Sequence, residues 1–547
     1  MSSGVADFFS GRGGFMGDID GALRSLLEFA RPLVMQGDFI RLRQVLDGVR
    51  VDTELKAQYF VDASYAESLQ GHYQNARTAA IMAFCLQPTN VETLRQLAAR
   101  LRTVNEAGLL FDLIARSGPL SKIPIPLLLT YAAQLSYLNL QEAALPFLDE
   151  ARRADPCYPP TLVSRGQVLT YLGRVAEAIH EFERCIELAP QLGQAYWFLA
   201  QVRRATEGRN NIERLREMLG QAGLPIRERI SMEFALHKEL DDMGDYSGAW
   251  EVLEQACQTK RRTLSYRPID TTRIVDALIA LPSGAVTADQ ESKGPTSIFI
   301  VGMHRSGTTL LEQMLDCNPN VAAFGELYDF TSAMRYVTDH HCRGVIDLSI
   351  IDRSLAVELG QAGLQYLKGV AWRLKDKRFF TDKLPSNFFN VGFICRALPG
   401  AKILHMVRDP METCFSNLRE LFSDANPHSY DQQELAHFYV EYERLMAHWH
   451  TQFPGRILDI HYAELTASPD AVMRRVAEFC GLDYVSTMQD PSNSRRAVAT
   501  ASAVQVRDKV IRRETPKWVP YDRFLGKLKN GLNRPGRDRN LPLIVDT

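Results

Sequence analysis

The chain has 547 residues, of which 46% are hydrophobic, so it is long enough for more than one domain and a sizeable core. Its 63 basic and 65 acidic side chains give a formal net charge of −2, which lacks the basic excess of proteins that bind nucleic acids or anionic membranes. No apolar run approaches the roughly 20 residues of a transmembrane helix. We therefore predict no nucleic-acid partner and no membrane segment.

The N-terminal sequence and the cysteines indicate the cellular compartment. The first residues lack the basic stretch and the long apolar run of a signal peptide. The nine cysteines are scattered, without a C-x-x-C pair, and most fall in segments with apolar periodicity. We therefore expect a cytoplasmic protein with reduced thiols. The sequence does not indicate the oligomeric state.

A register of turn residues runs along the first half of the chain. Five residues stand 34 positions apart, and two more follow at spacings of 35 and 36: Gly37, Gly71, Asn105, Asn139, Gly173, Gly208 and Gly244. In four units an alanine follows five positions after the turn residue, and in three units a proline follows after seventeen. Gly and Asn tolerate the left-handed backbone of a tight turn, and alanine lets two helices approach closely. This pattern is typical of tetratricopeptide repeats.

We predict an all-α tetratricopeptide superhelix over residues 20–262, with about seven helix pairs. A single pair cannot bury its apolar face, so the pairs must stack into an array with a concave groove. We expect a protein or peptide partner in this groove, because such arrays commonly bind proteins. The sequence leaves open whether the repeats recruit a substrate or only act as a scaffold. A connecting segment, 263–295, ends in a turn-rich polar stretch.

Residues 296–547 show the pattern of an α/β domain. Apolar, β-rich runs at 298–302, 403–407 and 457–462 alternate with helical patterns. This alternation predicts a parallel sheet with helices on both faces. Ligands of such sheets bind at the carboxyl ends of the strands, so we expect the site at the residues that follow these runs.

A glycine-spaced loop follows the first run and precedes a helical pattern. It extends from Gly302 to Thr309 and nearly matches the P-loop pattern, but Thr308 stands where that pattern has a lysine. The backbone N–H groups of such a loop, together with the helix N-terminus, bind an oxyanion. Because the lysine that reaches the β- and γ-phosphates is missing, we expect a nucleotide other than ATP or GTP. Arg305 would supply positive charge.

A second phosphate motif follows the run at 403–407. Arg408 and Asp409 come directly after it, and Ser416 lies on the helical segment that follows. The guanidinium group of Arg408 and the hydroxyl of Ser416 could bind a second phosphate beside the first. The alternative is that Arg408 only pairs with Asp409 or Asp382.

These two motifs resemble those of sulfotransferases that use 3′-phosphoadenosine 5′-phosphosulfate (PAPS). Residues 305–309 resemble the 5′-phosphosulfate loop, and residues 407–409 with a serine eight positions after the arginine resemble the 3′-phosphate motif. Over about residues 295–530 the chain is similar to tyrosylprotein sulfotransferases and to their bacterial homologues that are fused to helical repeats. The resemblance implies a P-loop-like sulfotransferase domain with PAPS as co-substrate and no metal.

The resemblance also implies roles for single residues. A Gly-Glu pair stands 21 positions after Arg305, which makes Glu326 the general base. Arg305 and Lys383 would stabilise charge on the sulfuryl group, with Ser502 beside the leaving group. Tyr462 would lie near the adenine. The donors to the 5′-phosphate would be Ser306, Gly307, Thr308 and Thr309.

Structural roles remain open for several of these residues. Glu326 could be a surface carboxylate, Lys383 part of a surface salt bridge, Ser502 an ordinary loop serine and Tyr462 a core tyrosine. A basic run at 507–517 could close over the phosphates or form a solvated face.

The sequence does not define the sulfate acceptor. The family has a second glutamate after the Gly-Glu pair, where this chain has Leu327, so a preference for acidic peptides does not follow. A protein tyrosine, which is the first candidate, a carbohydrate hydroxyl and a small-molecule alcohol all offer the same nucleophile. A fragment that begins near residue 285 would keep every phosphate motif.

Two other functions compete with sulfation: a P-loop kinase, and a catalytically inactive nucleotide-binding scaffold. The missing loop lysine and the missing aspartate for Mg²⁺ argue against a kinase. The retained charged residues argue against an inactive scaffold. Residues 340–342, His-His-Cys, are not expected to bind a metal, because adjacent histidines rarely converge on one ion. His304 in the phosphate loop could be a packing residue, a substrate contact or a proton carrier.

Overall fold

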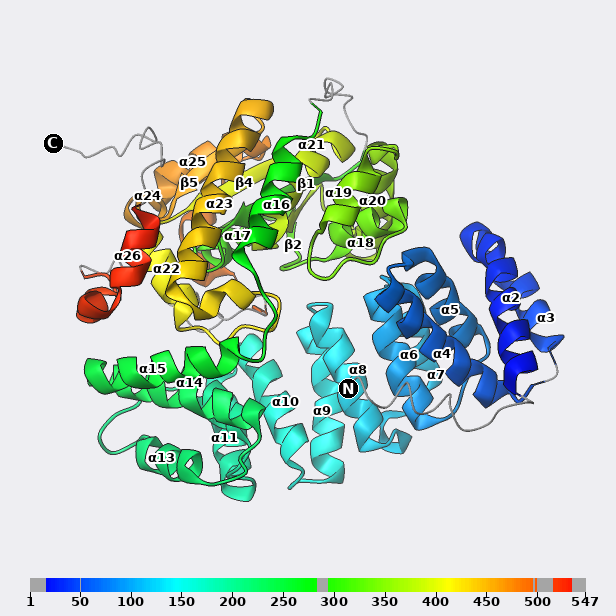
Figure 1. The fold of residues 1–547 in the computed structure, drawn as a ribbon, viewed down its shortest axis with the longest axis horizontal. Helices are drawn as coiled ribbons and strands as arrows, with labels where there is room; N and C mark the ends of the chain where they lie inside the picture. The colour runs from blue at the N-terminus through cyan, green and yellow to red at the C-terminus, as the bar shows by residue number, and fades with distance from the viewer. Residues whose placement is uncertain (1–15, 50, 283–293, 495–496, 499–514, 534–547) are drawn as a thin grey trace.

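The computed structural model describes residues 16–49, 51–282, 294–494, 497–498 and 515–533. In these residues the N-terminal half is a row of stacked helix pairs, which Figure 1 shows beneath the C-terminal half. The seven pairs are α2 (Met16–Gln36) and α3 (Phe39–Asp47), α4 (Thr53–Gln70) and α5 (Tyr73–Cys85), α6 (Val91–Thr103) and α7 (Ala107–Arg116), α8 (Ile125–Tyr137) and α9 (Gln141–Ala154), α10 (Pro159–Tyr171) and α11 (Val175–Leu188), α12 (Gly193–Val202) and α13 (Ile212–Gly220), and α14 (Ile226–Asp242) and α15 (Tyr246–Arg261).

The turns explain why the 34-residue register forms helix pairs. The backbone φ angle is positive at Gly71 (89°), Asn105 (61°), Asn139 (60°) and Gly173 (77°), where the chain reverses between two helices. Glycine and asparagine adopt this conformation at low cost. Ala178, five positions after Gly173, is fully buried, so its small side chain allows α11 to lie close to α10. The predicted helical-repeat fold of this half is confirmed.

The sixth pair departs from the register. Helix α12 ends at Val202, and Thr206 and Arg209 exchange backbone hydrogen bonds of 3.2 and 3.0 Å in an isolated antiparallel bridge. Gly208 therefore lies in a longer connection and not in a tight turn between two helices.

The C-terminal half contains a five-stranded parallel sheet, which confirms the predicted fold class of this half. Its strands are β1 (Thr296–Gly302), β2 (Val321–Ala323), β3 (Phe379–Asp382), β4 (Lys402–Val407) and β5 (Ile457–His461), in the spatial order β2–β3–β1–β4–β5. Because β1 is central, the residues that follow β3 and β4 lie on either side of the loop that follows β1. The predicted strand at 457–462 ends one residue earlier, and Tyr462 begins a helix.

Helices cover both faces of this sheet (Figure 1). In β1, Ile298 and Ile300 pack toward α17, α24 and α25, whereas Phe299 and Val301 face the larger core formed with α18, α20, α21 and α23. The helices of this half are α16 (Pro268–Ile279), α17 (Thr308–Asp316), α18 (Asp329–Thr338), α19 (Leu348–Ser354), α20 (Leu359–Leu374), α21 (Val391–Ala397), α22 (Pro410–Leu418), α23 (Gln432–Gln452), α24 (Tyr462–Ala467), α25 (Pro469–Cys480) and α26 (Gly526–Leu532). Short 3₁₀ helices are η1 (Leu120–Lys122) in the repeats and η2 (Pro385–Asn390), η3 (Pro427–Tyr430), η4 (Ser486–Gln489), η5 (Pro491–Asn493) and η6 (Val519–Phe524) here.

Part of the predicted connecting segment forms helix α16, which packs against α23. Val275 and Leu278 of α16 are fully buried, and Arg444 of α23 donates to Asp276 at 2.7 Å. Residues 283–293 lie outside the described residues. No helix in the described ranges has the length and apolar content to cross a membrane. The nine cysteines all lie in the described residues as thiols outside any disulfide, and seven of them are buried.

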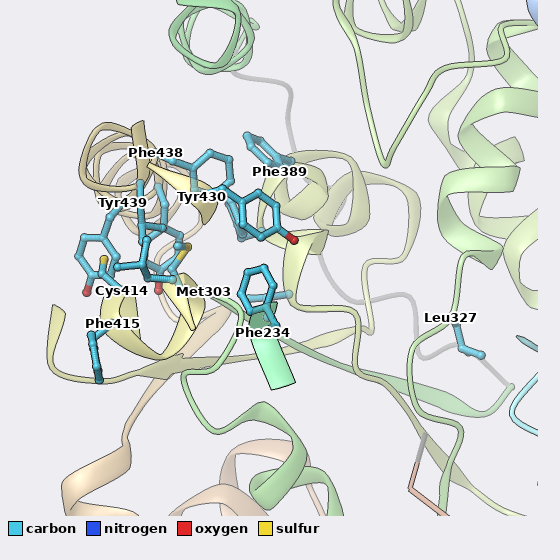
Figure 2. Packing of buried hydrophobic residues seen from close by; sticks show 14 of the residues in the cluster. Phe234, Met303, Leu327, Phe389, Cys414, Phe415, Tyr430, Phe438 and Tyr439 are labelled. Atoms are coloured by element: carbon cyan, nitrogen blue, oxygen red, sulfur yellow. The ribbon is translucent and has the colours of Figure 1, made fainter. Parts of the chain in front are cut away.

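One continuous apolar core joins the two halves of the chain. Figure 2 shows Phe234 of α14 beside Tyr430 of η3, with the ring centroids 6.1 Å apart. Trp250 of α15 stacks on Phe524 at 5.1 Å. A fragment that begins near residue 285 would keep the phosphate motifs but would lose α16 and expose this core. Simple truncation therefore does not isolate the catalytic half.

Polar contacts fix the same arrangement. Asp241 of α14 accepts hydrogen bonds from Arg419 and from the hydroxyl of Tyr521, each at 2.5 Å. Arg261 pairs with Glu434 at 2.7 Å. Three repeat turns also bond to the C-terminal half: the N–H of His341 to the carbonyl of Gly71 (2.9 Å), Nδ2 of Asn139 to the carbonyl of Glu326 (3.1 Å), and the N–H of Val498 to the carbonyl of Tyr171 (2.8 Å).

We expect the two halves to unfold in one cooperative transition, because they share a core and partly buried ion pairs. Asp241→Ala should lower the free energy of unfolding by about 3 kcal/mol, since it leaves Arg419 and Tyr521 without their acceptor. Guanidinium chloride unfolding of the full chain measures this loss. Glu213→Ala, which removes an exposed ion pair with Arg216, should change stability by less than about 0.5 kcal/mol. Two separate transitions, with only one of them shifted by Asp241→Ala, would contradict a shared core.

Candidate active site

The loop between β1 and α17 has the shape of a phosphate loop. Gly302 (φ 146°), Arg305 (φ 68°) and Gly307 (φ 109°) all have positive φ angles, so the chain turns sharply before α17. A Cβ atom on Gly307 would lie 2.5 Å from the ring of Tyr462, so only glycine fits there. Gly307 is the N-cap of α17 and has no side chain to occupy the first N–H groups of the helix. The loop is therefore shaped to accept an anion.

The second predicted phosphate motif lies directly beside this loop. Because β4 is a neighbour of β1, Arg408 at the end of β4 reaches the loop and donates to the carbonyl of Arg305 at 3.2 Å. Its guanidinium group lies 4.4 Å from the ring centroid of Tyr462 and pairs with Glu412 at 2.9 Å. The expected alternative partners, Asp409 and Asp382, do not pair with Arg408 within the described residues. Asp409 instead caps α22.

Ser416 contacts the first motif and not the second. Its hydroxyl accepts a hydrogen bond from Nε of Arg305 at 3.2 Å, while Arg305 approaches Glu420 at 3.8 Å. Burial lowers the pKa of Arg305 and raises the pKa of Glu420. Together with Arg408, these side chains line a cavity of about 1090 Å³ between the two halves of the chain.

The Gly-Glu pair brings a carboxylate to the same cavity. Glu326 lies in the loop after β2, and its Oε1 accepts a hydrogen bond from Nζ of Lys383 at 2.8 Å. The Lys383 side chain is 1% exposed, whereas that of Glu326 is 34% exposed. This pair is thus not a surface salt bridge: the lysine is buried behind the carboxylate, and the carboxylate faces the cavity.

Two residues that the sequence analysis did not assign to the site hold this loop. Glu312 is a buried acid on α17, and its Oε1 accepts bonds from the N–H of Gly325 at 2.8 Å and from the hydroxyl of Thr381 at 2.7 Å. The only hint in the sequence is an acid within the apolar face of the helix after the phosphate loop. Asn139 of the repeats donates from Nδ2 to the carbonyls of Phe324 (2.9 Å) and Glu326 (3.1 Å). Nothing in the local sequence indicates this contact.

His304, the residue before Arg305, lies near the carboxylate and is uncharged at neutral pH. Burial lowers the pKa of its imidazole to about 4, and the nearby Glu326 opposes this shift only in part. The ring lies edge-on to Phe422 at 5.7 Å, and its backbone carbonyl accepts a bond from Asn417 at 2.7 Å. The His304 ring thus packs against Phe422 and also lines the cavity beside Glu326.

Ser502, the basic run at 507–517 and Leu327 are the remaining residues that the sequence analysis considered for the site. Ser502 lies outside the described residues, as do residues 507–514 of the basic run, while Lys517 and Trp518 line the cavity. Leu327 is 2% exposed and packs in the core, apart from the other labelled side chains in Figure 2. It therefore cannot contact an acceptor.

The histidines at 340–342 do not converge on one point. His340 bonds to Asp347 at 2.8 Å, whereas His341 packs against Tyr73.

A different group has the residue types of a metal site: the ligand atoms of His405, His450 and Asp459 lie within 4.8 Å of one another. In the structure the Asp459 carboxylate accepts hydrogen bonds from both rings, at 2.7 and 2.9 Å.

Part of the chain is similar in sequence to known sulfotransferases. Residues 295–486 match the model of the sulfotransferase family. An uncharacterized protein of Aquifex aeolicus is 30% identical over 399 residues, which cover 70% of this chain and 51% of that protein. The chain thus spans about half the length of this relative. A putative protein-tyrosine sulfotransferase of Caenorhabditis briggsae is 26% identical over 35% of this chain and 67% of that protein. Protein-tyrosine sulfotransferase 2 of Gallus gallus is 25% identical, over 44% of this chain and 64% of that protein.

Solved structures align with this chain at low similarity. The sulfotransferase domain from the curacin biosynthetic pathway aligns with 44% of this chain and 99% of its own length, at 16% identity and a TM-score of 0.27. A tetratricopeptide-repeat protein with an unusual peptide-binding site aligns with 35% of this chain and 89% of its own, at 16% identity and a TM-score of 0.23. The phosphate loop, Glu326, Lys383 and Arg408 all lie within the segment of this chain that matches the sulfotransferase family.

Proposed function

We propose that the C-terminal half transfers the sulfuryl group of PAPS to an acceptor hydroxyl. The observation that carries the proposal is the Glu326 carboxylate, which is held by the buried Lys383 and faces the same cavity as a phosphate loop and a second arginine motif. Phosphate-binding motifs and a candidate proton acceptor thus lie together, as a transfer reaction requires. The match of this segment to the sulfotransferase family supports the same chemistry.

The two phosphate motifs divide the nucleotide between them. The N–H groups and hydroxyls of residues 306–309, at the N-terminus of α17, would hold the 5′-phosphosulfate. Arg408 and Ser416 would hold the 3′-phosphate, and Tyr462 would lie beside the adenine. Arg408 already stacks on Tyr462, so its guanidinium group is held in place before the nucleotide arrives.

The transfer requires few chemical groups. The acceptor oxygen forms a bond to sulfur, the bond from sulfur to the bridging 5′-phosphate oxygen breaks, and the hydroxyl proton passes to Glu326. Lys383 and Arg305 would stabilise the negative charge that develops on the sulfuryl and bridging oxygens. Ser502, implied by resemblance alone, would assist the same oxygen. Because Lys383 is buried, its ammonium group is fixed and needs little reorganisation.

The acceptor that we propose is a protein or peptide, with tyrosine as the first candidate. The supporting observation is that the repeats supply part of the cavity wall, through Tyr171, Gln201 and Lys238. The rival function is sulfation of a carbohydrate or small molecule, with the repeats as a scaffold. A kinase or an inactive nucleotide-binding scaffold is a further alternative. The nucleotide experiment below separates a kinase from sulfation, and the sulfate-transfer assay below separates an inactive scaffold from it.

We expect adenosine 3′,5′-bisphosphate to bind about 10- to 100-fold more tightly than 5′-AMP, because a charge-assisted contact to the 3′-phosphate is worth about 1.5–3 kcal/mol. Calorimetry in the presence of EDTA measures both affinities and that of ATP. Arg408→Gln should weaken the bisphosphate selectively and bring its affinity close to that of AMP. Equal affinities of the wild-type chain for the two nucleotides would refute the 3′-phosphate site, and tight magnesium-dependent binding of ATP would favour a kinase.

Glu326→Gln keeps the shape of the side chain but removes its ability to accept a proton. Turnover should fall about 10²–10⁴-fold while the affinity for adenosine 3′,5′-bisphosphate changes little. Transfer of radiolabelled sulfate from PAPS to proteins of the host extract provides the assay. The control Glu464→Gln alters an exposed glutamate that pairs with Arg475 and should leave turnover unchanged. If Glu326→Gln keeps more than a tenth of the turnover, Glu326 is not the base.

Asn139→Gly tests whether a repeat turn positions the base. Glycine keeps the positive φ angle of this turn but removes the donor to the carbonyls of Phe324 and Glu326. We expect kcat to fall roughly 10- to 100-fold, with nucleotide affinity and melting temperature nearly unchanged, because small displacements of a catalytic group are costly. Asn139→Asp, which places a negative charge against two carbonyls, should lower kcat further. Unchanged kcat in both variants would show that the loop holds its position without the repeats.

A further inference from the structure

A histidine–aspartate group lies between the edge of the sheet and helix α23; it consists of His405, His450 and Asp459. His405 of β4 and Asp459 of β5 are partners in the parallel register, so their side chains leave the same face of the sheet. Helix α23 lies against this face (Figure 1), and His450 near its C-terminal end reaches the same point. The ring nitrogens and the carboxylate oxygen lie within 4.8 Å of one another. Two strands and a helix thus bring three donor atoms together on rigid elements.

The Asp459 carboxylate is paired with the two rings alone. Its Oδ1 accepts hydrogen bonds from Nδ1 of His405 at 2.7 Å and from Nε2 of His450 at 2.9 Å. No lysine or arginine of the described ranges lies at ion-pair distance from this carboxylate. The side chains of Asp459 and His450 are 25% and 36% exposed, so the group is partly shielded from water but accessible to an ion from solvent. Partly buried carboxylates are usually paired with a cation or coordinate a metal.

The second ring nitrogen of His405 is held as well. Its Nε2 forms a hydrogen bond with the hydroxyl of Tyr442, which stands eight positions before His450 on α23. A histidine that binds a metal through Nδ1 carries its proton on Nε2, and an acceptor at Nε2 fixes the tautomer and the orientation of the ring. The Tyr442 hydroxyl is such an acceptor. Because the His405 side chain is only 7% exposed, this arrangement is part of the packed interior of the domain.

We propose that His405, His450 and Asp459 bind one divalent transition-metal ion, with zinc as the first candidate. Two imidazole nitrogens and one carboxylate oxygen suit zinc, whereas magnesium and calcium prefer oxygen ligands. Metal–ligand distances of about 2.0–2.1 Å in a tetrahedral site place the donor atoms about 3.3 Å apart. The two N···O distances of 2.7 and 2.9 Å would each lengthen by about 0.5 Å to admit the ion. Water would complete the coordination from the solvent side.

The ion would brace the two strands that lead to the phosphate motifs. His405 stands three residues before Arg408, and Asp459 stands three residues before Tyr462. At about 3.3 Å per residue, the histidine–aspartate group lies roughly 10 Å along the strands from this stacked pair. Its three members, all of them described, are not among the residues that line the cavity. The ion would therefore be structural, and this inference does not depend on the proposed sulfuryl transfer.

Cobalt(II) tests the site on the untagged full chain, because it replaces zinc and reports its ligands by visible absorption. Chain freed of metal with a chelator and then desalted should take up one equivalent of Co²⁺ and show the d–d bands of a four-coordinate ion. A near-ultraviolet thiolate charge-transfer band, which would indicate binding at one of the nine cysteines, should be absent. One equivalent of Zn²⁺ should displace the cobalt. With free zinc about 100-fold above its dissociation constant, the melting temperature should rise by about 2–3 °C.

Matched variants locate the ion. Asp459→Asn and His450→Gln should each lower the affinity for zinc about 100-fold or more, because each removes one of three ligands. Tyr442→Phe keeps the three ligands but removes the acceptor of the His405 ring, and it should lower the affinity about tenfold. The control His448→Gln removes a nearby histidine of the same helix, whose ring contacts Trp449, and should leave zinc binding unchanged. Circular dichroism in EDTA confirms that each variant is folded.

Three results would overturn the proposal: no saturable uptake of one equivalent of cobalt or zinc by the wild-type chain, a cobalt spectrum dominated by thiolate ligands, or unchanged zinc affinity in both Asp459→Asn and His450→Gln. The first two are measured on the wild-type chain, so they decide the matter even if a variant does not fold. Uptake of one equivalent that is lost in His450→Gln and kept in His448→Gln would support the site.

Discussion

The central position of β1 in a parallel sheet determines where every charged group of the site can lie. Its carboxyl end carries the phosphate loop, and its two neighbours are β3 and β4, which are followed directly by Lys383 and Arg408. The lysine and the arginine therefore flank the loop from opposite sides. The outer strand β2 lies next to β3, so the Gly-Glu loop that follows β2 lies beside Lys383, where Lys383 and Glu326 pair. A sheet with a different strand order would separate these groups.

The carboxylate at this site is held from three directions. Glu312 accepts a hydrogen bond from the backbone N–H of Gly325, and Lys383 donates to the side chain of Glu326. Asn139 donates to the backbone carbonyls on either side of Gly325. One support belongs to the nucleotide-binding elements, one to the sheet and one to the repeats. The repeats are thus part of the construction of the site, in addition to any role in binding an acceptor.

The sequence predicted those features that depend on short-range patterns. The 34-residue register predicted the helix pairs, and the loop after 298–302 and the motif at Arg408 were recognisable because each follows a strand within a few residues. The fixed distance from Arg305 pointed to Glu326. The contacts of Asn139, 187 residues before its partner Glu326, could not be predicted, because a turn asparagine looks the same whether it satisfies only its own backbone or also holds another domain. Helix α16 was not predicted, because the polar, turn-rich stretch that follows it made the whole segment 263–295 look like a linker.

The asparagine turn at 139 also limits how this repeat array can change. A free-standing solenoid can gain or lose a unit with little effect on the others, because each unit contacts only its neighbours. Here the array is attached to the C-terminal half at several places, among them the turn at Asn139 and the helices α14 and α15. Insertion or loss of one 34-residue unit between these places would move the asparagine away from the Gly-Glu loop while the distal end stayed anchored. The number of helix pairs from α8 to α15 is therefore set by the distance between these two attachment points on the C-terminal half.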